Sequence, residues 1–164
     1  LLGRGHERIA AIINKESNTG RERMAGYERA LREHGIEPDP ELELHSAYYI
    51  DDAFESAKGV LKSDATAVFA SSDNIALGLL KLLYAEDLRV PRDYSVVSYD
   101  NSAADTLFEP ALTSIEQNSR ELAAAALELM FARLEEDAES RERAASVTKI
   151  LRPKVVVKDS VRWL

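Results

Sequence analysis

The chain has 164 residues, of which 45% are apolar and 30% are charged. This balance excludes disordered, collagen-like and membrane proteins and indicates one globular domain of ordinary size. The absence of cysteine excludes disulfides, thiolate metal sites and thiol nucleophiles, and it is typical of a reducing compartment. The net charge of −8 argues against these residues gripping DNA or anionic lipid, so any DNA contact must lie outside them.

The apolar pattern favours neither export nor a membrane span. The longest apolar stretch, Leu122–Leu134, is interrupted by Glu128 and Arg133, and no signal-peptide pattern opens the chain. We therefore expect a cytoplasmic protein without membrane contact. Because the chain starts at Leu1 and a buried strand begins near Ile9, we expect an internal fragment of a longer protein; an omitted disordered beginning is the alternative.

The first predicted elements are a buried strand and an amphipathic helix. Residues 8–13 are predicted to form a strand. The apolar run that follows Arg8 is continuous, which favours a strand covered on both faces. The helix that follows has a capping box from Thr19 and Glu22, and Gly35 ends it as a left-handed cap.

The next stretch repeats this alternation of strand and helix. Residues 42–45 predict a short strand, and Asp51 caps a second helix. Residues 65–70 predict another buried strand, and Ser72 or Asp73 caps a third helix.

A fourth strand over Tyr94–Tyr99 completes the regular part of the chain. Strands that alternate with helices of about a dozen residues favour right-handed crossovers and a mostly parallel sheet. The fold class is therefore α/β.

The second part of the chain is less regular. Residues 101–113 predict an irregular loop, and Asn118 or Ser119 caps a longer helix. The charged run at 135–143 is typical of a solvated loop. Pro153 separates two short β-rich pieces at the end of the chain, residues 147–151 and 154–159.

Polar side chains follow each of the four predicted strands. Because ligands bind outside the carboxyl ends of the strands in an open parallel sheet, we expect these side chains to converge. An arginine fork, an aromatic face and carboxylates suit a neutral polyol or heterocycle. The candidates are Ser17, Arg21, Arg23, Tyr48, Tyr49, Ser72, Asp73, Asp100 and Asn101.

Each candidate also has a simpler structural explanation. Arg21 and Arg23 are compatible with solvated helix charges, and Tyr48 with a cover over the sheet edge. Asp73 is compatible with a helix N-cap alone. Asp100 follows a strand that reads as fully buried, so its carboxylate needs a partner.

Enzyme and metal-site interpretations find little support. The sequence has no dinucleotide or phosphate-binding glycine loop, no G-x-S-x-G elbow and no H-E-x-x-H motif. His6, His34 and His45 are scattered, so we expect no metal and no cofactor. The one enzymatic alternative is a hydrolase-like acid–base pair of Asp73 and Asp100.

Six sequence blocks are spread along nearly the whole length of the chain. They are GHERIAAI (5–12), RERMAGYERALREHGI (21–36), AVFASSDNIALGLL (67–80), VPRDYSVVSYDN (90–101), PALTSIEQ (110–117) and ILRPKVVVKDSV (150–161). In order and spacing they resemble the effector-binding core of LacI/GalR-family bacterial transcription repressors. The fourth and fifth blocks are the more specific ones, whereas AVFASSDNIALG also occurs in sugar-binding transport proteins.

The resemblance implies a periplasmic-binding-protein-like core of two three-layer lobes that close on a small effector. Residues 1–112 would form the complete C-terminal lobe, and residues 113–153 a helix and strand returning to an incomplete N-terminal lobe. Residues 154–164 would be the final strand and tail. Operator DNA would be contacted only through a missing N-terminal region.

The resemblance also implies roles for single residues. Ser72 stands where the family commonly has Asn, which puts the ligand contacts there in doubt, and Ser98 stands where Gly is usual. Effector contacts are assigned by motif position to Arg23, Tyr48, Asp100 and Gln117.

We therefore expect the effector-binding domain of a sugar-responsive transcription regulator that leaves its ligand chemically unchanged. The alternative is the solute-binding protein of a sugar uptake transporter. We expect a homodimer whose contact surface includes Leu77, Lys81 and Phe108. The apolar helix 122–134 would either fold back on its own sheet or be exchanged between chains.

Overall fold

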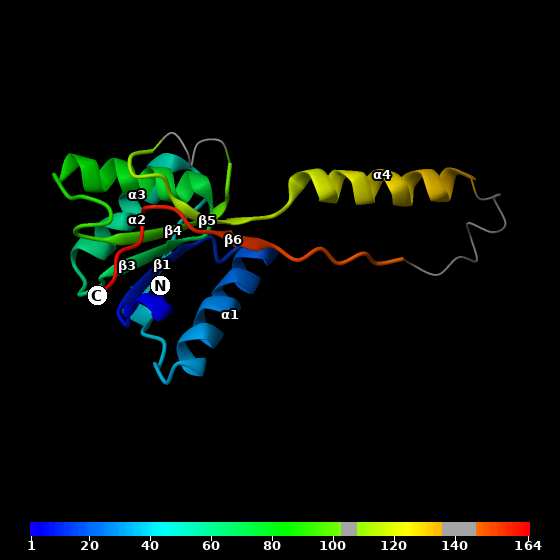
Figure 1. The fold of residues 1–164 in the computed structure, drawn as a ribbon. Helices are drawn as coiled ribbons and strands as arrows, with labels where there is room; N and C mark the ends of the chain where they lie inside the picture. The colour runs from blue at the N-terminus through cyan, green and yellow to red at the C-terminus, as the bar shows by residue number, and fades with distance from the viewer. Residues whose placement is uncertain (103–107, 136–146) are drawn as a thin grey trace.

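A six-stranded sheet forms the centre of the computed structural model, which describes residues 1–102, 108–135 and 147–164 (Figure 1). The strand order is β2-β1-β3-β4-β5-β6, and all neighbouring pairs are parallel except β5 and β6. The mostly parallel α/β sheet expected from the sequence is thus confirmed. The strands are β1 (Ile9–Ile13), β2 (Glu43–His45), β3 (Ala67–Ala70), β4 (Ser95–Asp100), β5 (Thr113–Glu116) and β6 (Lys154–Val156).

Helices cover both faces of this sheet and make three layers. Figure 1 shows α2 and α3 on one face and α1 on the other. The chain also has two short 3-10 helices, η1 (Leu2–Arg4) and η2 (Pro40–Leu42). The α-helices are α1 (Asn18–Glu33), α2 (Ile50–Leu61), α3 (Asp73–Ala85) and α4 (Ser119–Glu135).

Strand β1 shows why a continuous apolar run is required here. All five of its residues are buried, because its alternate side chains point to opposite faces and both faces are covered. Ala10 and Ile12 belong to the core against α2 and α3, whereas Ile9, Ala11 and Ile13 belong to the core against α1.

The start of α1 differs from the expected capping box. Ser17 is the N-cap, and its Oγ accepts a hydrogen bond of 2.9 Å from the amide of Gly20. Thr19 is therefore inside the first turn, and its hydroxyl lies 3.2 Å from the Tyr48 hydroxyl instead. The end of the helix agrees with the sequence, since Gly35 has a φ of 75°.

The starts of α2 and α3 show which of the expected helix caps form. Asp51 does not cap α2: the helix begins one residue earlier, and the Asp51 carboxylate accepts a hydrogen bond of 2.9 Å from Lys81 of α3. Of the two caps considered for α3, Ser72 is the one found, because its Oγ accepts from the Ile75 amide.

Strand β5 was not predicted from the sequence. It pairs in parallel with β4 and antiparallel with β6, so residues 113–116 and 154–156 belong to the same sheet as residues 9–100. The division into a complete lobe over residues 1–112 and a returning segment over 113–153 remains a prediction, although the sheet itself continues past Leu112.

The helix α4 extends away from the sheet together with the segment from residue 147 to β6 (Figure 1). Lys149 pairs with Glu128 of α4 at 2.7 Å, so the two segments lie side by side at this point. Folding back of this helix onto its own sheet is therefore contradicted. Residues 147–151 do not form the predicted strand, since the described residues offer them no strand partner, and most of the charged run at 135–143 lies outside the described residues.

Candidate functional site

A cavity of 450 Å³ lies where β2, β3 and β4 lead into the loops and helices that follow them. Its lining comes from chain segments that are far apart in the sequence. This is the edge of the sheet where ligands of open parallel sheets bind. The lining residues are Thr19, Arg23, Tyr48, Ser72, Asp73, Asn74, Asp100 and Ser102.

Arg23 projects from the second turn of α1 towards the ends of β3 and β4. Its guanidinium donates a hydrogen bond to the carbonyl oxygen of Ser71, and its Nη2 lies 3.9 Å from the Asp100 carboxylate. Only 15% of the side chain is exposed. A guanidinium has five N–H donors in a planar fork, so most of its donors remain for a ligand.

Asp100 ends β4 with a strained backbone. Its φ of 118° lies in a region that residues other than glycine rarely adopt, at a cost of about 1–3 kcal/mol. Burial raises the pKa of the Asp100 carboxyl, and the nearby Asp73 carboxylate acts in the same direction. Arg23 and the hydrogen bond from Gln117 oppose this rise. The site thus holds a desolvated acid beside a cation.

Asp73 begins α3 and is 7% exposed. Its Oδ2 accepts a hydrogen bond of 2.9 Å from the amide of Ser102. Its Oδ1 is buried and has no hydrogen-bond partner within the described part of the chain. A buried carboxylate oxygen in a cavity wall is a strong acceptor, and it favours a ligand that donates a hydrogen bond.

Tyr48 lies in the loop between β2 and α2 and is held at the start of α1. Its hydroxyl is 2.7 Å from Ser17 Oγ and 3.2 Å from Thr19 Oγ1. Ser17 therefore contributes by fixing Tyr48 and capping α1, and it does not line the cavity itself. The aromatic ring of Tyr48 provides an apolar wall beside the polar groups.

Several predicted site residues lie outside the cavity. Arg21 donates to the carbonyl oxygen of Glu16 and to the Asn18 side chain and does not line the cavity. Tyr49 is 74% exposed. Asn101 accepts a hydrogen bond from Lys158, and Gln117 donates one to the Asp100 carboxylate without lining the cavity.

Other contributors were missed from the sequence. Thr19, Asn74 and Ser102 line the cavity, and Tyr99 lies under the guanidinium of Arg23. Thr19 and Tyr99 carry no motif signal, because a capping residue and a strand aromatic look the same whether or not a ligand site adjoins them. Asn74 and Ser102 directly follow the candidates Asp73 and Asn101, and that adjacency was the available signal.

The described residues, 1–102, 108–135 and 147–164, contain no cluster of three His, Asp or Glu side chains that could hold a metal ion. Within the same part of the chain, no helix is both long enough and apolar enough to span a bilayer.

The chain is similar to a known domain family and to bacterial transcriptional repressors. The family described as "Periplasmic binding protein-like domain" matches residues 1–161. The HTH-type transcriptional repressor PurR of Pasteurella multocida (strain Pm70) is 33% identical over 165 residues, which cover 99% of this chain and 48% of that protein. The chain thus spans about half the length of the curated relatives it matches.

Solved structures with bound sugars resemble the fold closely. The complex of the transcriptional regulator CelR with cellobiose has a TM-score of 0.87 and 32% identity, over 98% of this chain and 48% of that one. A LacI family transcriptional regulator from Enterococcus faecium with bound ribose has a TM-score of 0.89 and 26% identity, over 100% of this chain and 60% of that one.

The helix–sheet–helix layers of this chain are shared with the solved structures that it resembles. The chain belongs to the periplasmic binding protein-like domain family, in the form found in the effector-binding domains of LacI-family transcription regulators.

Proposed function

We propose that the chain is the ligand-sensing part of a transcription regulator and that its effector is an uncharged, hydroxyl-rich molecule of the sugar type. The observation that carries this proposal is the presence of Arg23 and two carboxylates, Asp73 and Asp100, in the lining of one cavity, with Arg23 3.9 Å from Asp100. A hydroxyl group both donates and accepts, so one polyol satisfies Asp73, Asp100 and Arg23 together. Its apolar ring face packs against Tyr48.

The balance of charge in the cavity sets the class of ligand. Asp73 and Asp100 carry two negative charges against one positive charge on Arg23. An anionic ligand such as a sugar phosphate would face two carboxylates in a half-buried site, where like charges repel strongly. A neutral polyol brings no such repulsion.

The regulator would act by a shift of population. An effector that binds one arrangement of the intact protein more tightly biases the protein towards or away from operator binding, and only the difference in affinity matters. We assign the contact with operator DNA to a region outside this sequence, because the chain has a net charge of −8. The repressor names of the relatives favour this role over solute uptake.

Thermal unfolding of the intact protein with a ligand panel tests the proposal. The panel contains ribose, cellobiose, glucose 6-phosphate and adenine, each at rising concentration, with calorimetric titration of any that stabilises. Binding at 100 times Kd stabilises by about 2.7 kcal/mol. We expect a neutral sugar to stabilise and the phosphate ester not to. Stabilisation by the phosphate ester alone would overturn the assigned ligand class, and recovery of a chemically altered sugar would support the enzymatic alternative.

A further inference from the structure

The guanidinium of Arg23 rests on the ring of Tyr99. The carbon Cζ of Arg23 lies 3.7 Å from the ring centroid, within the range of a cation–π contact. Tyr99 is the last residue but one of β4, and its neighbour in the β5 register is Ile115. The ring is therefore attached to the middle of the sheet, whereas Arg23 comes from a helix.

Three different contacts fix the orientation of this guanidinium. The Ser71 carbonyl oxygen accepts one N–H group, and Asp100 attracts another from 3.9 Å. Both of these contacts leave the group free to rotate about the line that joins them. The Tyr99 ring lies against the face of the planar fork, and it removes that rotation.

The surroundings of Tyr99 explain why the ring is needed. Tyr99 and Arg23 both line a second cavity of 720 Å³ between α1 and the sheet, and most of the other side chains there are apolar, among them Phe69 and Val97. Without the aromatic ring, the arginine side chain has open space on that side. It would then lose its position towards Asp100 and the cavity of 450 Å³ described above, here called the effector cavity.

We infer that Tyr99 is a positioning residue of the effector site, which acts by holding Arg23 with its N–H donors directed at the ligand. The inference rests on the proposed function of the cavity. Tyr99 itself does not line the effector cavity, so its effect on a ligand passes through Arg23.

The first readout needs no ligand. It is the pKa of the Asp100 carboxyl, measured by NMR titration in the intact protein. This pKa reports the position of Arg23, because the positive charge of Arg23 lowers it. We expect Tyr99→Leu to raise this pKa and Tyr99→Phe to leave it unchanged. Phe69→Leu is the matched control, since Phe69 is an aromatic residue of the adjacent strand that lines the same second cavity. An unchanged Asp100 pKa in folded Tyr99→Leu would overturn the inference.

The second readout is affinity for the panel sugars ribose and cellobiose. We expect Tyr99→Leu to weaken binding about 10-fold, the size of a partly desolvated cation–π contact, and Tyr99→Phe to retain it. In a protein that already carries Arg23→Lys, Tyr99→Leu should reduce sugar affinity little further, because the guanidinium that the ring supports is already absent. Additive losses would mean that Tyr99 acts independently of Arg23 and would overturn the inference.

The unmodified protein supplies a check if Tyr99→Leu does not fold. The side-chain protons of Arg23 should show upfield ring-current shifts that vanish in Tyr99→Ile and persist in Tyr99→Phe. Absence of those shifts in the unmodified protein would overturn the inference. If neither sugar binds while the Asp100 titration responds as expected, the sugar assignment fails and the role of Tyr99 stands.

Discussion

Gly78 of α3 lies so close to Ile50 of α2 that a Cβ atom at residue 78 would be 2.4 Å from the Ile50 carbonyl oxygen. The same atom would lie 2.5 Å from the Cβ of Ala53. Backbone atoms cannot yield as the end of a flexible side chain does. The close α2–α3 contact therefore depends on a glycine in the middle of a helix.

We predict that Gly78→Ala destabilises the chain by about 1–3 kcal/mol, the usual cost of overpacking, although alanine favours helices. Gly26→Ala is the control, because a Cβ atom at Gly26 in α1 meets nothing within 4 Å. That change should stabilise by about 0.5–1 kcal/mol. Urea unfolding of both variants gives the two values, and equal effects of the two changes would contradict the prediction.

Arg23 and Arg21 are separated by two positions on α1 and have different surroundings. We predict that Arg23→Ala weakens effector binding about 10- to 100-fold, because it removes charge-assisted hydrogen bonds to the ligand. Arg21→Ala should leave affinity unchanged, since Arg21 bonds to Glu16 and Asn18 outside the cavity. Calorimetric titration of the intact protein decides, and thermal unfolding shows whether each variant is folded. Equal affinity in both variants would remove Arg23 from the site.

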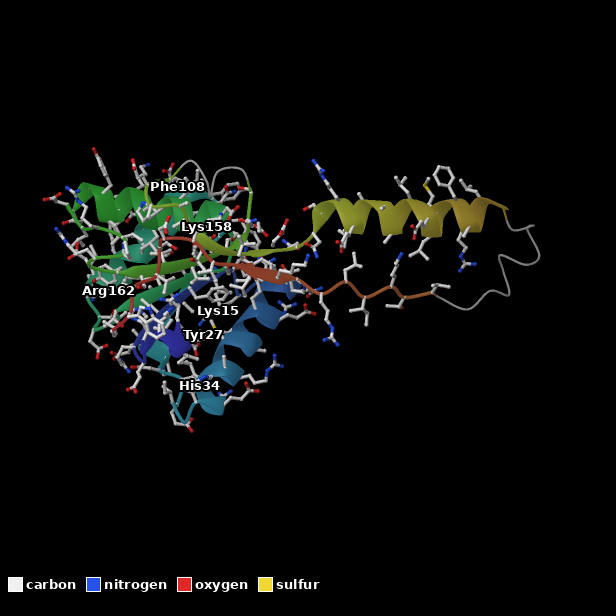
Figure 2. The ribbon with its side chains drawn as sticks, in the orientation of Figure 1. Lys15, Tyr27, His34, Phe108, Lys158 and Arg162 are labelled. Atoms are coloured by element: carbon white, nitrogen blue, oxygen red, sulfur yellow. The ribbon has the colours of Figure 1, made fainter. Side chains whose placement is uncertain are left out.

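His6 ties the start of the chain to its end. It is fully buried, with Nδ1 2.9 Å from Thr66 Oγ1 and Nε2 3.2 Å from the Arg162 carbonyl oxygen (Figure 2 shows Arg162 beside the first strands). Burial lowers the pKa of His6 below 6.5, and the positive charges of the N-terminus and Arg162 lower it further. The hydrogen bond to the Arg162 carbonyl oxygen acts in the opposite direction.

This shift makes stability depend on pH. Below pH 6.5, and down to the lower pKa of folded His6, the unfolded chain binds a proton at this residue and the folded chain does not. The free energy of unfolding therefore falls as the pH falls through this range. We predict that His6→Gln reduces the loss of stability between pH 7.5 and pH 5.5. Urea unfolding at the two pH values measures it. An unchanged loss in folded His6→Gln would contradict the prediction.

Two surfaces of the chain are candidates for a contact between copies. Leu77 of α3 is half-buried, and Lys81 pairs with Asp51, whereas Phe108 packs against the core over α2 and α3 (Figure 2). On α4, Phe131 is 56% exposed. A twofold contact would bury the same patch on both chains.

We predict a dimer at micromolar concentration, and Leu77→Glu should shift it towards monomer in sedimentation velocity. Phe108 is a poor test position, because a charge there would also disturb the core. Phe131→Glu on α4 is the companion variant. If only that change dissociates the dimer, the contact belongs to α4; a monomer in the unmodified chain would contradict the prediction altogether.

The local sequence pattern was sufficient to predict features that depend on a single strand or helix. The run Ile9–Ile13 needs cover on both faces, and Gly35 ends α1, because burial and backbone conformation follow from the residue types themselves. The convergence of Arg23, Tyr48 and Asp100 was also predictable, since parallel strands bring their carboxyl ends to one edge.

Where several side chains could make the same kind of contact, only the packing of the elements in space shows which one makes it. The order of residue types along the chain was enough to predict the α/β class, the parallel crossovers and the edge of the sheet at which the polar residues gather. It could not determine that the Thr19 hydroxyl meets the Tyr48 hydroxyl, that Asp51 pairs with Lys81, or that Tyr99 lies under Arg23. These choices depend on distances between elements that are remote in the chain, and a pattern of residue types along one element carries no information about them.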